Sequence, residues 1–238
     1  MLKGKLYLIP VTLGSKDHNY VIPPKVLLLI GSLRKFAVED VRSARRFLRM
    51  VDPEFPIDQS DFMLLDKNTA SEDIGKMLRC LNEGSHMGLM SEAGMPGIAD
   101  PGAKLVIRAH ASGVKVIPLT GPSSIFLALM SSGLNGQNFT FNGYLPINKY
   151  DRIREIKKLE KMAREGQSQI FMETPYRNMK LLDDIVTTLS HDTYLCIAAS
   201  ITKPDEYIST RSISDWAKKG LPDINKKPAI FIIGKKPF

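Results

Sequence analysis

A segment rich in glycine and proline, SEAGMPGIADPG at residues 91–102, is the part of the chain best suited to bind a ligand. It follows a short apolar run and precedes an amphipathic one, so it joins a strand to a helix. In an open α/β sheet, such loops lie at the carboxyl ends of the strands, where ligands bind. Its glycines let the backbone approach a ligand closely, while Pro96 and Pro101 stiffen the loop. We therefore predict a ligand-binding loop, with a tight structural turn as the alternative.

A second loop, residues 120–124, follows the next apolar run. Ser123 and Ser124 can bond a ligand or cap the helix that follows, and the two roles are compatible. The chain lacks the G-x-G-x-x-G dinucleotide fingerprint, the G-x-x-x-x-G-K-[ST] phosphate loop and the G-x-S-x-G nucleophile motif. These absences disfavour a nicotinamide enzyme, a P-loop nucleotidase and a serine hydrolase.

Four arginines have the spacing of one helix face: Arg42, Arg45, Arg46 and Arg49. Separations of three, four and seven residues place side chains next to one another on a helix. No acidic residue separates these cations, which repel one another unless an anion binds, and arginine suits phosphate. We predict an RNA-binding surface here. The charged run 149–164 also contains acidic residues, and we interpret it as a solvated helix face.

These segments belong to a series of strand-sized apolar runs that alternate with amphipathic runs. The first half of the chain has expected strands at 6–10, 35–38, 62–65, 87–90 and 114–119, with helices at 41–50, 71–81 and 103–112 and either the start of a helix or a connection at 23–30. The second half has expected strands at 139–144, 169–172, 194–199 and 229–233, with helices at 125–132, 150–165, 178–189 and 214–219. The alternation predicts an α/β protein with a substantially parallel sheet. We predict two α/β domains, residues 1–118 and 119–238.

The composition limits what kind of protein this is. The 238 residues include 33 Lys and Arg against 25 Asp and Glu, a net charge of +8 that favours an anionic partner such as nucleic acid. No apolar run has the length of a membrane span, and Pro10 interrupts the one stretch that resembles a signal peptide. We therefore expect a cytoplasmic protein without membrane contact. The two cysteines and four histidines lack metal-ligand spacing, so no metal site is expected.

Taken together, the motifs resemble a known family. Eight segments occur in the order and rough spacing of the tetrapyrrole methylase superfamily: 6–9, 39–42, 91–102, 120–124, 132–134, 141–146, 171–177 and 202–206. The resemblance is to its ribosomal RNA branch, the small-subunit ribose 2′-O-methyltransferases that act on 16S rRNA, and it covers nearly the whole chain. Its most specific parts are 91–102, GPS at 121–123 and FMETPYR at 171–177.

The resemblance implies S-adenosylmethionine as methyl donor, two α/β domains with the cofactor cleft between them, and a homodimer that acts on 16S rRNA or the 30S subunit. It also implies cofactor contacts from loops of both domains. Carried onto this chain, the contacts are Pro10, Leu13, Gly94, Met95, Ile98, Ser123 and Ser124, and in the second domain Leu145, Met172, Ala199 and Pro228.

Methyl transfer to a ribose hydroxyl depends mainly on positioning donor and acceptor, and a general base helps because the hydroxyl is a poor nucleophile. The acidic candidates are Glu39, Asp40, Glu92, Asp100 and Glu173. We predict the catalytic role for Glu39 and Glu92. The structural alternatives are a solvated helix start for Glu39 and the capping of backbone N–H groups for Asp100. A lysine or water is the remaining alternative as base.

The chain departs from the family pattern at three places. VTLGSKD at 11–17 replaces the usual first loop, EAGMP at 92–96 replaces D-A-G-T-P, and EDVR at 39–42 replaces E-D-T-R. Cofactor binding through backbone atoms tolerates these changes, so they bear on the substrate. One alternative is the methylation of a tetrapyrrole-like or other small metabolite, which needs a closed apolar cavity. The other is a noncatalytic RNA-binding or ribosome-assembly protein, which binds RNA without the cofactor.

Overall fold

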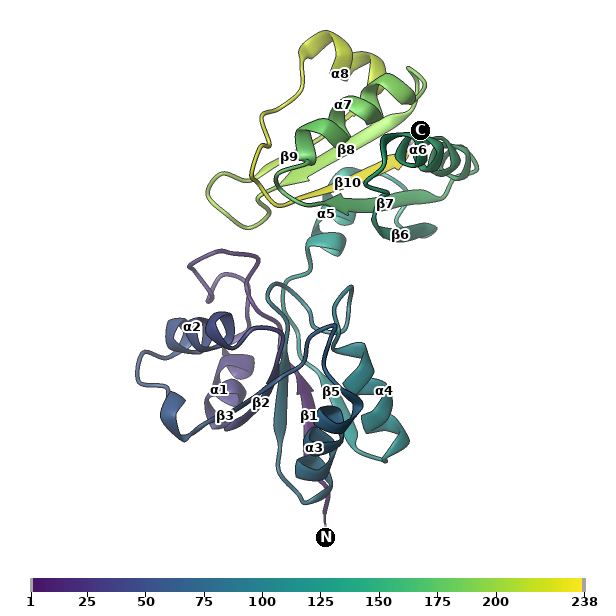
Figure 1. Ribbon diagram of the computed structural model, residues 1–238. Helices are drawn as coiled ribbons and strands as arrows, with labels where there is room; N and C mark the ends of the chain where they lie inside the picture. The colour runs from purple at the N-terminus through teal and green to yellow at the C-terminus, as the bar shows by residue number, and fades with distance from the viewer. Residues whose placement is uncertain (1, 237–238) are drawn as a thin grey trace. The chain divides into compact units, whose positions relative to one another are not determined.

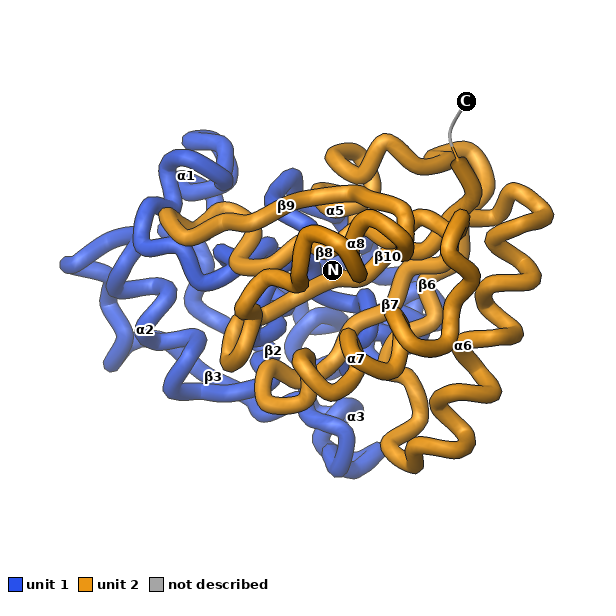
Figure 2. The backbone as a smooth tube through the Cα atoms, turned by 90° about the horizontal axis from the view of Figure 1, so that it is seen from above, with its two compact units in different colours: residues 1–123 blue, residues 124–238 orange. Residues whose placement is uncertain are grey.

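The computed structural model describes residues 2–236, and the chain divides into two compact units at Ser123 and Ser124 (Figure 2). The division falls slightly later than the predicted boundary after residue 118. The reason is that the loop beginning at Leu119 belongs with the first unit, where the Leu119 N–H donates to the Leu8 carbonyl at 3.1 Å. No helix among the described residues is both long and apolar enough to cross a membrane.

The first unit is a parallel sheet of five strands in the order β3-β2-β4-β1-β5 (Figure 1). Its elements are β1 (Lys5–Leu8), α1 (Pro24–Ser32), β2 (Lys35–Val38), α2 (Val41–Val51), the 3-10 turn η1 (Ile57–Gln59), β3 (Asp61–Leu64), α3 (Ser71–Asn82), β4 (Met87–Met90), α4 (Ala103–Ala111) and β5 (Lys115–Pro118). These elements follow the predicted series closely, and the parallel order confirms the α/β prediction for this half.

Alternating strand side chains fill the two faces of this sheet. Phe36 and Val38 of β2 pack with the buried side chains of α1 and α2, whereas Ala37 packs with those of α3 and α4. The helix pairs therefore cover opposite faces (Figure 1). The connection after β1 leads to one face and the connection after β4 to the other, although β1 and β4 are neighbours. Such a switch point leaves a crevice at the carboxyl ends of the two strands.

The second unit has a mixed sheet in the order β6-β7-β10-β8-β9. Its elements are α5 (Ser124–Ser132), β6 (Phe139–Tyr144), α6 (Lys149–Arg164), β7 (Ser168–Glu173), α7 (Asn178–Thr188), β8 (Tyr194–Ala199), β9 (Tyr207–Ser212), α8 (Ile213–Lys219) and β10 (Ala229–Gly234). Only β6 and β7 pair in parallel, while β10 is antiparallel to both of its neighbours. The prediction of a substantially parallel sheet is wrong for this half, because β10 is antiparallel to β7 and β8, and β9, which is absent from the predicted series, is antiparallel to β8.

The core of the second unit lies between the sheet and the three helices α6, α7 and α8. Phe171 and Phe231 stack in it with ring centroids 5.8 Å apart, and Trp216 is fully buried beside them. The Trp216 indole N–H donates to the Leu195 carbonyl at 3.0 Å, which satisfies its one polar group. Helix α5 contacts β8, β9 and β10. Trp216 is the single tryptophan of the chain, so its fluorescence reports on this unit alone.

Candidate cofactor and acceptor site

Three loops meet at the carboxyl edge of the first sheet. The loop after β1 reaches the loop after β4 through an isolated bridge, in which the Val11 N–H donates to the Gly94 carbonyl at 2.9 Å. The Leu119 N–H, at the end of β5, donates to the Leu8 carbonyl. Because β1 lies between β4 and β5, its loop contacts both others. The two loops with ligand-binding character in the sequence therefore lie on either side of the same strand.

Two glycines permit close packing between these loops. Gly94 has a φ of +71°, and a Cβ atom there would lie 3.2 Å from Leu13 Cδ2. A Cβ atom on Gly121 would lie 2.2 Å from Pro10 Cβ, closer than real atoms approach. The candidate cofactor residues Pro10, Leu13 and Gly94 thus lie in one contact group with the loop that contains buried Ser123.

We expect the Gly121→Ala variant to lose about 1–3 kcal/mol of stability through overpacking against Pro10. The same strain should shift the loop and weaken S-adenosylmethionine binding. Thermal unfolding and calorimetric titration with S-adenosylmethionine measure the two effects. Gly31→Ala in α1 is the matched control, because a Cβ atom there meets nothing within 4 Å. Wild-type behaviour of Gly121→Ala in both assays would contradict the close packing.

The loop after β4 is held in shape by Asp100. Its carboxylate accepts hydrogen bonds from the N–H of Gly97 at 2.8 and 2.9 Å and from the N–H of Gly102 at 2.7 Å. Burial raises the pKa of Asp100 above its ordinary value, although these bonds act in the opposite direction. Ala99 adopts a φ of +61°, a conformation that side chains other than glycine seldom take and that recurs at functional loops. Asp100 therefore has the capping role and is not available as a base.

A cavity of about 380 Å³ opens beside this loop. It is lined by Leu8, Met95, Pro96, Gly97, Ile98, Ala103, Val106, Ile107, His110, Pro118 and Leu119. Met95 and Ile98 are the two candidate cofactor residues among them. The volume lies within the range of small-molecule sites, and the apolar wall with few polar groups suits a flat base such as adenine. The size and apolar wall of this cavity therefore suit a flat, largely apolar ligand.

Glu39 and Glu92 lie next to each other at the same sheet edge. Glu39 follows β2, its N–H donates to the Met90 carbonyl at 3.3 Å, and its Oε2 accepts the Glu92 N–H at 3.2 Å. Burial raises the pKa of Glu39 above its ordinary value, and the charges of Glu92 and Asp100 add to the rise. A carboxylate with a raised pKa is a stronger base once it is ionised. Glu92 itself is exposed.

A second cavity, of about 340 Å³, adjoins Glu92. Its lining residues come from the loop after β1, from α2 and from the end of β4: Val11, Thr12, Gly14, Ser15, Lys16, Ser43, Ala44, Arg46, Phe47, Met50, Met90, Ser91 and Glu92. The wall combines two cations, several hydroxyl groups and one carboxylate. Val11 lines this cavity and Met95, next to Gly94, lines the first one, so the two cavities flank the Val11–Gly94 bridge.

The four arginines of α2 are exposed, on the side of the helix away from its buried residues. Within residues 2–236, none of the four forms an ion pair. The Arg45 guanidinium lies over the Phe62 ring, 5.1 Å from its centroid, and Arg49 donates to the Pro53 carbonyl. Arg42 makes no such contact, and Arg46 is the one that lines the second cavity.

Asp40 is the N-cap of α2. Its carboxylate accepts the Ser43 N–H at 2.7 Å, and this bond holds the pKa of Asp40 below its ordinary value. The capping role accounts for Asp40. Among the described residues, the Glu39 and Glu92 carboxylates accept no hydrogen bond that caps a helix.

The candidate cofactor residues of the second unit lie at one end of its sheet, where β6, β7 and β8 finish and β10 begins. Met172 pairs with Tyr144 and Ile230, Ala199 pairs with Ala229, and the Ser200 N–H donates to the Pro228 carbonyl at 2.9 Å. Leu145 and Ala199 have buried side chains in the core under α6, α7 and α8, so they can contact a cofactor only through backbone atoms. Met172 is half-buried and Pro228 exposed, and Ser124 begins α5.

Glu173 ends β7 and is engaged in an ion pair. Only 2% of its side chain is exposed, and its Oε1 accepts the Thr174 N–H at 2.6 Å and the Arg177 Nε–H at 3.0 Å. These bonds hold the turn of the FMETPYR motif in place. Glu173 is therefore a structural residue, which removes it from the candidate bases.

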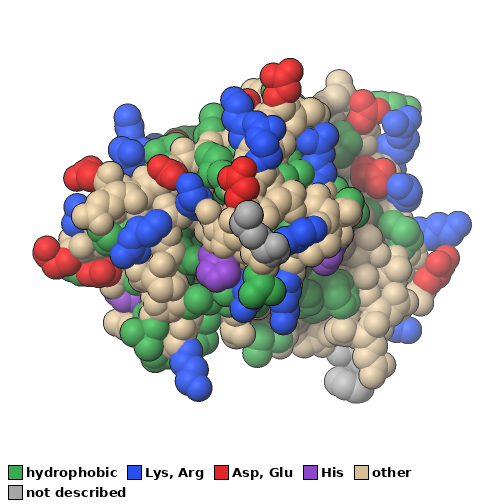
Figure 3. All heavy atoms as spheres, turned by 90° about the horizontal axis from the view of Figure 1, so that it is seen from below, with side chains coloured by type: hydrophobic (Ala, Val, Ile, Leu, Met, Phe, Trp, Pro, Cys, Tyr) green, Lys and Arg blue, Asp and Glu red, His purple; other side chains and the backbone are tan. Residues whose placement is uncertain are grey.

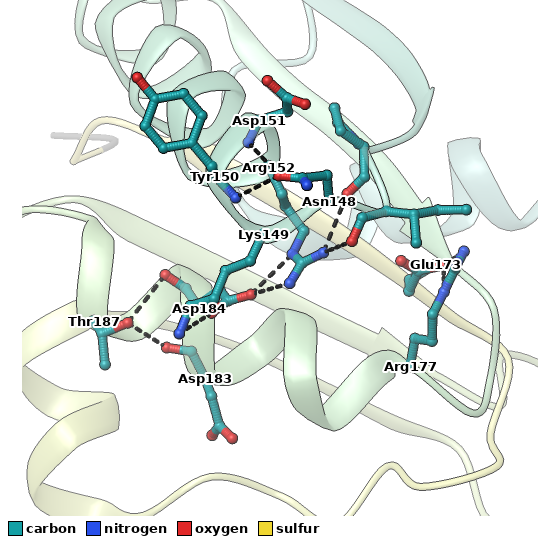
Figure 4. Close-up of polar contacts among 12 residues, drawn as sticks. Asn148, Lys149, Tyr150, Asp151, Arg152, Glu173, Arg177, Asp183, Asp184 and Thr187 are labelled. Atoms are coloured by element: carbon teal, nitrogen blue, oxygen red, sulfur yellow. Dashed lines mark hydrogen bonds and ion pairs between the residues drawn. The ribbon is translucent and has the colours of Figure 1, made fainter.

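Arg152 corrects the interpretation of run 149–164 as a solvated face. It is 3% exposed and pairs with buried Asp184 of α7 through its Nε–H at 2.8 Å (Figure 4). Its Nη1 donates to the carbonyls of Pro146 at 3.2 Å and Ile147 at 2.6 Å. The spacing contained a signal, because residues 152, 156, 159 and 163 share the buried face of α6. Arg152 thereby fixes the loop that follows Leu145.

No group of three or more His, Cys, Asp or Glu side chains suited to a metal ion occurs in the part of the chain that the structure describes. On the face drawn in Figure 3, Lys and Arg side chains are interspersed with Asp and Glu. The net positive charge is therefore not gathered on that face, in contrast to the run of arginines on α2.

The family model for tetrapyrrole (corrin/porphyrin) methylases matches residues 5–217. The chain is 31% identical over 228 residues to the ribosomal RNA small subunit methyltransferase I of Vibrio cholerae, covering 96% of this chain and 75% of that protein. It is also 31% identical to the enzyme of the same name from Escherichia coli O157:H7, covering 91% of this chain and 73% of the relative.

Solved structures of similar fold include cobalt precorrin-4 methyltransferase, with a TM-score of 0.61, 17% identity and coverage of 97% of this chain and 94% of that one. Another is the uroporphyrin-III C-methyltransferase of Thermus thermophilus in complex with S-adenosyl homocysteine, with a TM-score of 0.57, 14% identity and 97% coverage of both chains. These likenesses confirm the predicted architecture of two α/β units.

Proposed function

The chain belongs to the tetrapyrrole methylase family, and we propose that it transfers a methyl group from S-adenosylmethionine to a ribose 2′-hydroxyl of 16S ribosomal RNA. S-adenosylmethionine-dependent methyl transfer is the chemistry of this family. The choice of RNA as acceptor is supported by the relatives from Vibrio cholerae and Escherichia coli, which are similar over nearly the whole chain. We also propose that the enzyme acts in the cytoplasm as a homodimer, on rRNA or the 30S subunit.

S-adenosylmethionine supplies an activated methyl group, so the protein has mainly to bind, orient and deprotonate. The loop after β4 and the 380 Å³ cavity would hold the adenosine through Met95 and Ile98. The 340 Å³ cavity would receive the acceptor nucleotide. Glu39 would take the proton of the ribose hydroxyl, with exposed Glu92 as its neighbour on the acceptor side.

The observation that carries the choice of RNA is the juxtaposition of Arg46 and Glu92 in one cavity. Arg46 belongs to the face of α2 whose four arginines form no ion pair with a described residue, so it can hold a phosphate. The Glu92 N–H donates to Oε2 of Glu39, the proposed base, at 3.2 Å. A small tetrapyrrole-like metabolite would need a closed apolar cavity. The mixed wall with two cations is better matched to a nucleotide.

Calorimetric titration with S-adenosylmethionine, followed by methyl transfer to bare 16S rRNA and to 30S subunits, tests this proposal. We expect cofactor binding and label in the rRNA, with resistance of the modified linkage to alkaline hydrolysis as the signature of a 2′-O-methyl group. RNA binding without cofactor binding would point to the noncatalytic alternative. Cofactor binding without label in either RNA substrate would point to a small-molecule acceptor.

We expect Arg46→Ala to weaken RNA binding and to reduce its salt dependence. Each phosphate contact contributes about 0.7–0.9 to the slope of log affinity against log salt concentration, so the slope should fall by about that amount. Fluorescence anisotropy over a salt series measures it. Lys115→Ala is the matched control, because Lys115 is an exposed cation at the opposite end of the sheet, where β5 begins. An equal change of slope in both variants would contradict the role of Arg46.

A further inference from the structure

Three tyrosines that no step above uses are exposed in the two segments of the second unit at and after the ends of β6 and β7. Tyr144, Tyr150 and Tyr176 are 57%, 76% and 80% exposed, and Ile147 between the first two is 70% exposed. Large apolar side chains grouped on a surface mark a binding site more often than scattered ones do. Figure 4 shows the Tyr150 ring directed away from the Arg152–Asp184 pair, so it takes no part in that network.

The segments after β6 and β7 begin at the same end of the sheet. Strands β6 and β7 are parallel neighbours, and Tyr144 at the end of β6 pairs with Met172. Tyr150 lies in the first turn of α6, just after that strand, and Tyr176 lies in the turn between β7 and α7. This is the end of the sheet at which Leu145, Met172, Ala199 and Pro228 gather. The tyrosines therefore lie at the same end of the sheet as the candidate cofactor residues of the second unit.

Hydrogen bonds from buried side chains hold both segments in place. The Arg152 guanidinium bonds the carbonyls of Pro146 and Ile147 and is itself fixed by Asp184 (Figure 4). The Glu173–Arg177 pair holds the turn that carries Tyr176, and the Lys226 N–H donates to the Pro175 carbonyl at 3.1 Å. A surface that is already ordered loses little conformational entropy when a ligand binds. The buried polar network thus fixes the backbone that carries the exposed rings.

The charges around the rings favour an anion. Glu173 is neutralised by Arg177, and Asp184 by Arg152. The Lys149 Nζ lies 3.7 Å from Oδ1 of Asp184, which also pairs with Arg152. These three side chains together therefore carry one net positive charge. Lys226, placed against the Tyr176 turn by its backbone bond, is exposed and forms no ion pair with any described residue. A ligand at this end of the sheet should combine negative charge with flat apolar surfaces.

We propose that Tyr144, Tyr150 and Tyr176 form a stacking surface for unpaired bases of the RNA substrate. Aromatic rings beside cations are the usual means of holding single-stranded nucleic acid, since every base has a face that stacks and every phosphate a charge. The proposal rests on the proposed RNA methyltransferase function and adds the part of the RNA that the second unit recognises.

The test compares the wild type with the triple variant Tyr144→Ala, Tyr150→Ala, Tyr176→Ala on a fluorescent single-stranded oligouridine and on the corresponding duplex. Each tyrosine that stacks should contribute roughly fivefold to a hundredfold in affinity for the single strand. The slope of affinity against salt should not change, because the tyrosines carry no charge. S-adenosylmethionine binding and the thermal midpoint should stay at wild-type values, since the rings are exposed.

Two controls separate stacking from other effects. The triple Tyr→Phe variant keeps the rings and should bind RNA as the wild type does, and Leu28→Ala removes a side chain that is 77% exposed on the first unit. Unchanged single-strand affinity of the alanine variant, with methyl transfer to rRNA intact in the wild type, would overturn the stacking surface alone. If the triple alanine variant loses a dimer that the wild type forms and keeps its RNA affinity, the rings mediate contact between copies of the chain. That result would also overturn the stacking surface. A wild type that neither binds nor methylates RNA would remove the proposed function, and this surface with it.

Discussion

Replacing Glu39 by Gln is expected to lower the rate of methyl transfer by about 10²–10⁴-fold, the contribution of a well-placed general base. Gln keeps the size of the side chain and an oxygen that can accept the Glu92 N–H, now accepted at 3.2 Å. The loop after β4 should therefore keep its shape, and calorimetry should find S-adenosylmethionine affinity unchanged. Single-turnover methylation of the 30S subunit, with cofactor and subunit in excess over their dissociation constants, measures the chemical step.

The pH profile distinguishes a base from a residue that only shapes the site. A base works in its ionised form, so the wild-type rate should rise with pH through the pKa of Glu39. Burial raises that pKa above its ordinary value, which places the rise at a higher pH than for an exposed glutamate. The Glu39→Gln variant should lack this limb of the profile.

Glu92→Gln and Glu54→Gln complete the test. Glu92 is the other proposed catalytic carboxylate, and a large rate loss in its variant together with a retained acid limb in Glu39→Gln would assign the base to Glu92. Glu54, exposed in the turn after α2, is the matched control and should behave as wild type. Unchanged single-turnover rates in both Glu39→Gln and Glu92→Gln would exclude a carboxylate base at this edge.

Local sequence patterns predict most helices and strands of the first unit. Short continuous apolar runs place four-residue strands such as Lys35–Val38 and Met87–Met90 without error. Glycine and proline identify the loop at 91–102 because its conformation, with positive φ at Gly94 and Gly97, requires residues of that kind. The contact of Gly121 with Pro10 joins residues more than a hundred positions apart, and nothing in the local sequence specifies it.

The second unit shows where local patterns fail. Strand β9 has half-buried, mostly polar residues because it lies at the edge of the sheet, so it lacks the apolar run by which strands are found. The direction of β10 depends on pairing with β7 and β8, which is tertiary information. The charged residues around Arg152 in the sequence predict a surface cation. Its partner Asp184 lies on the buried face of another helix. A buried ion pair is visible only when both faces are considered together.

The Arg152–Asp184 pair gives a large expected loss of stability. Arg152→Met should destabilise the second unit by about 3–5 kcal/mol, because it leaves Asp184 buried with only the 3.7 Å contact to Lys149. The carbonyls of Pro146 and Ile147 lose their donor as well. Urea unfolding followed by Trp216 fluorescence measures the effect, since the single tryptophan lies in the core of this unit. Arg154→Met, on the same helix, removes an exposed pair with Asp151 and should cost under about 1 kcal/mol.

The double variant Arg152→Met, Asp184→Leu decides what the pair contributes. If the cost of Arg152→Met comes from an uncompensated buried charge, removing Asp184 as well should restore part of the lost stability. The loop after Leu145 would remain without its donor, so S-adenosylmethionine affinity and RNA affinity should stay reduced even where stability returns. Recovery of stability without recovery of binding is the outcome that separates positioning of the loop from support of the core. A midpoint of Trp216 unfolding in Arg152→Met equal to that of Arg154→Met would show that the buried pair does not support the core, and wild-type affinities in Arg152→Met would show that it does not position the loop.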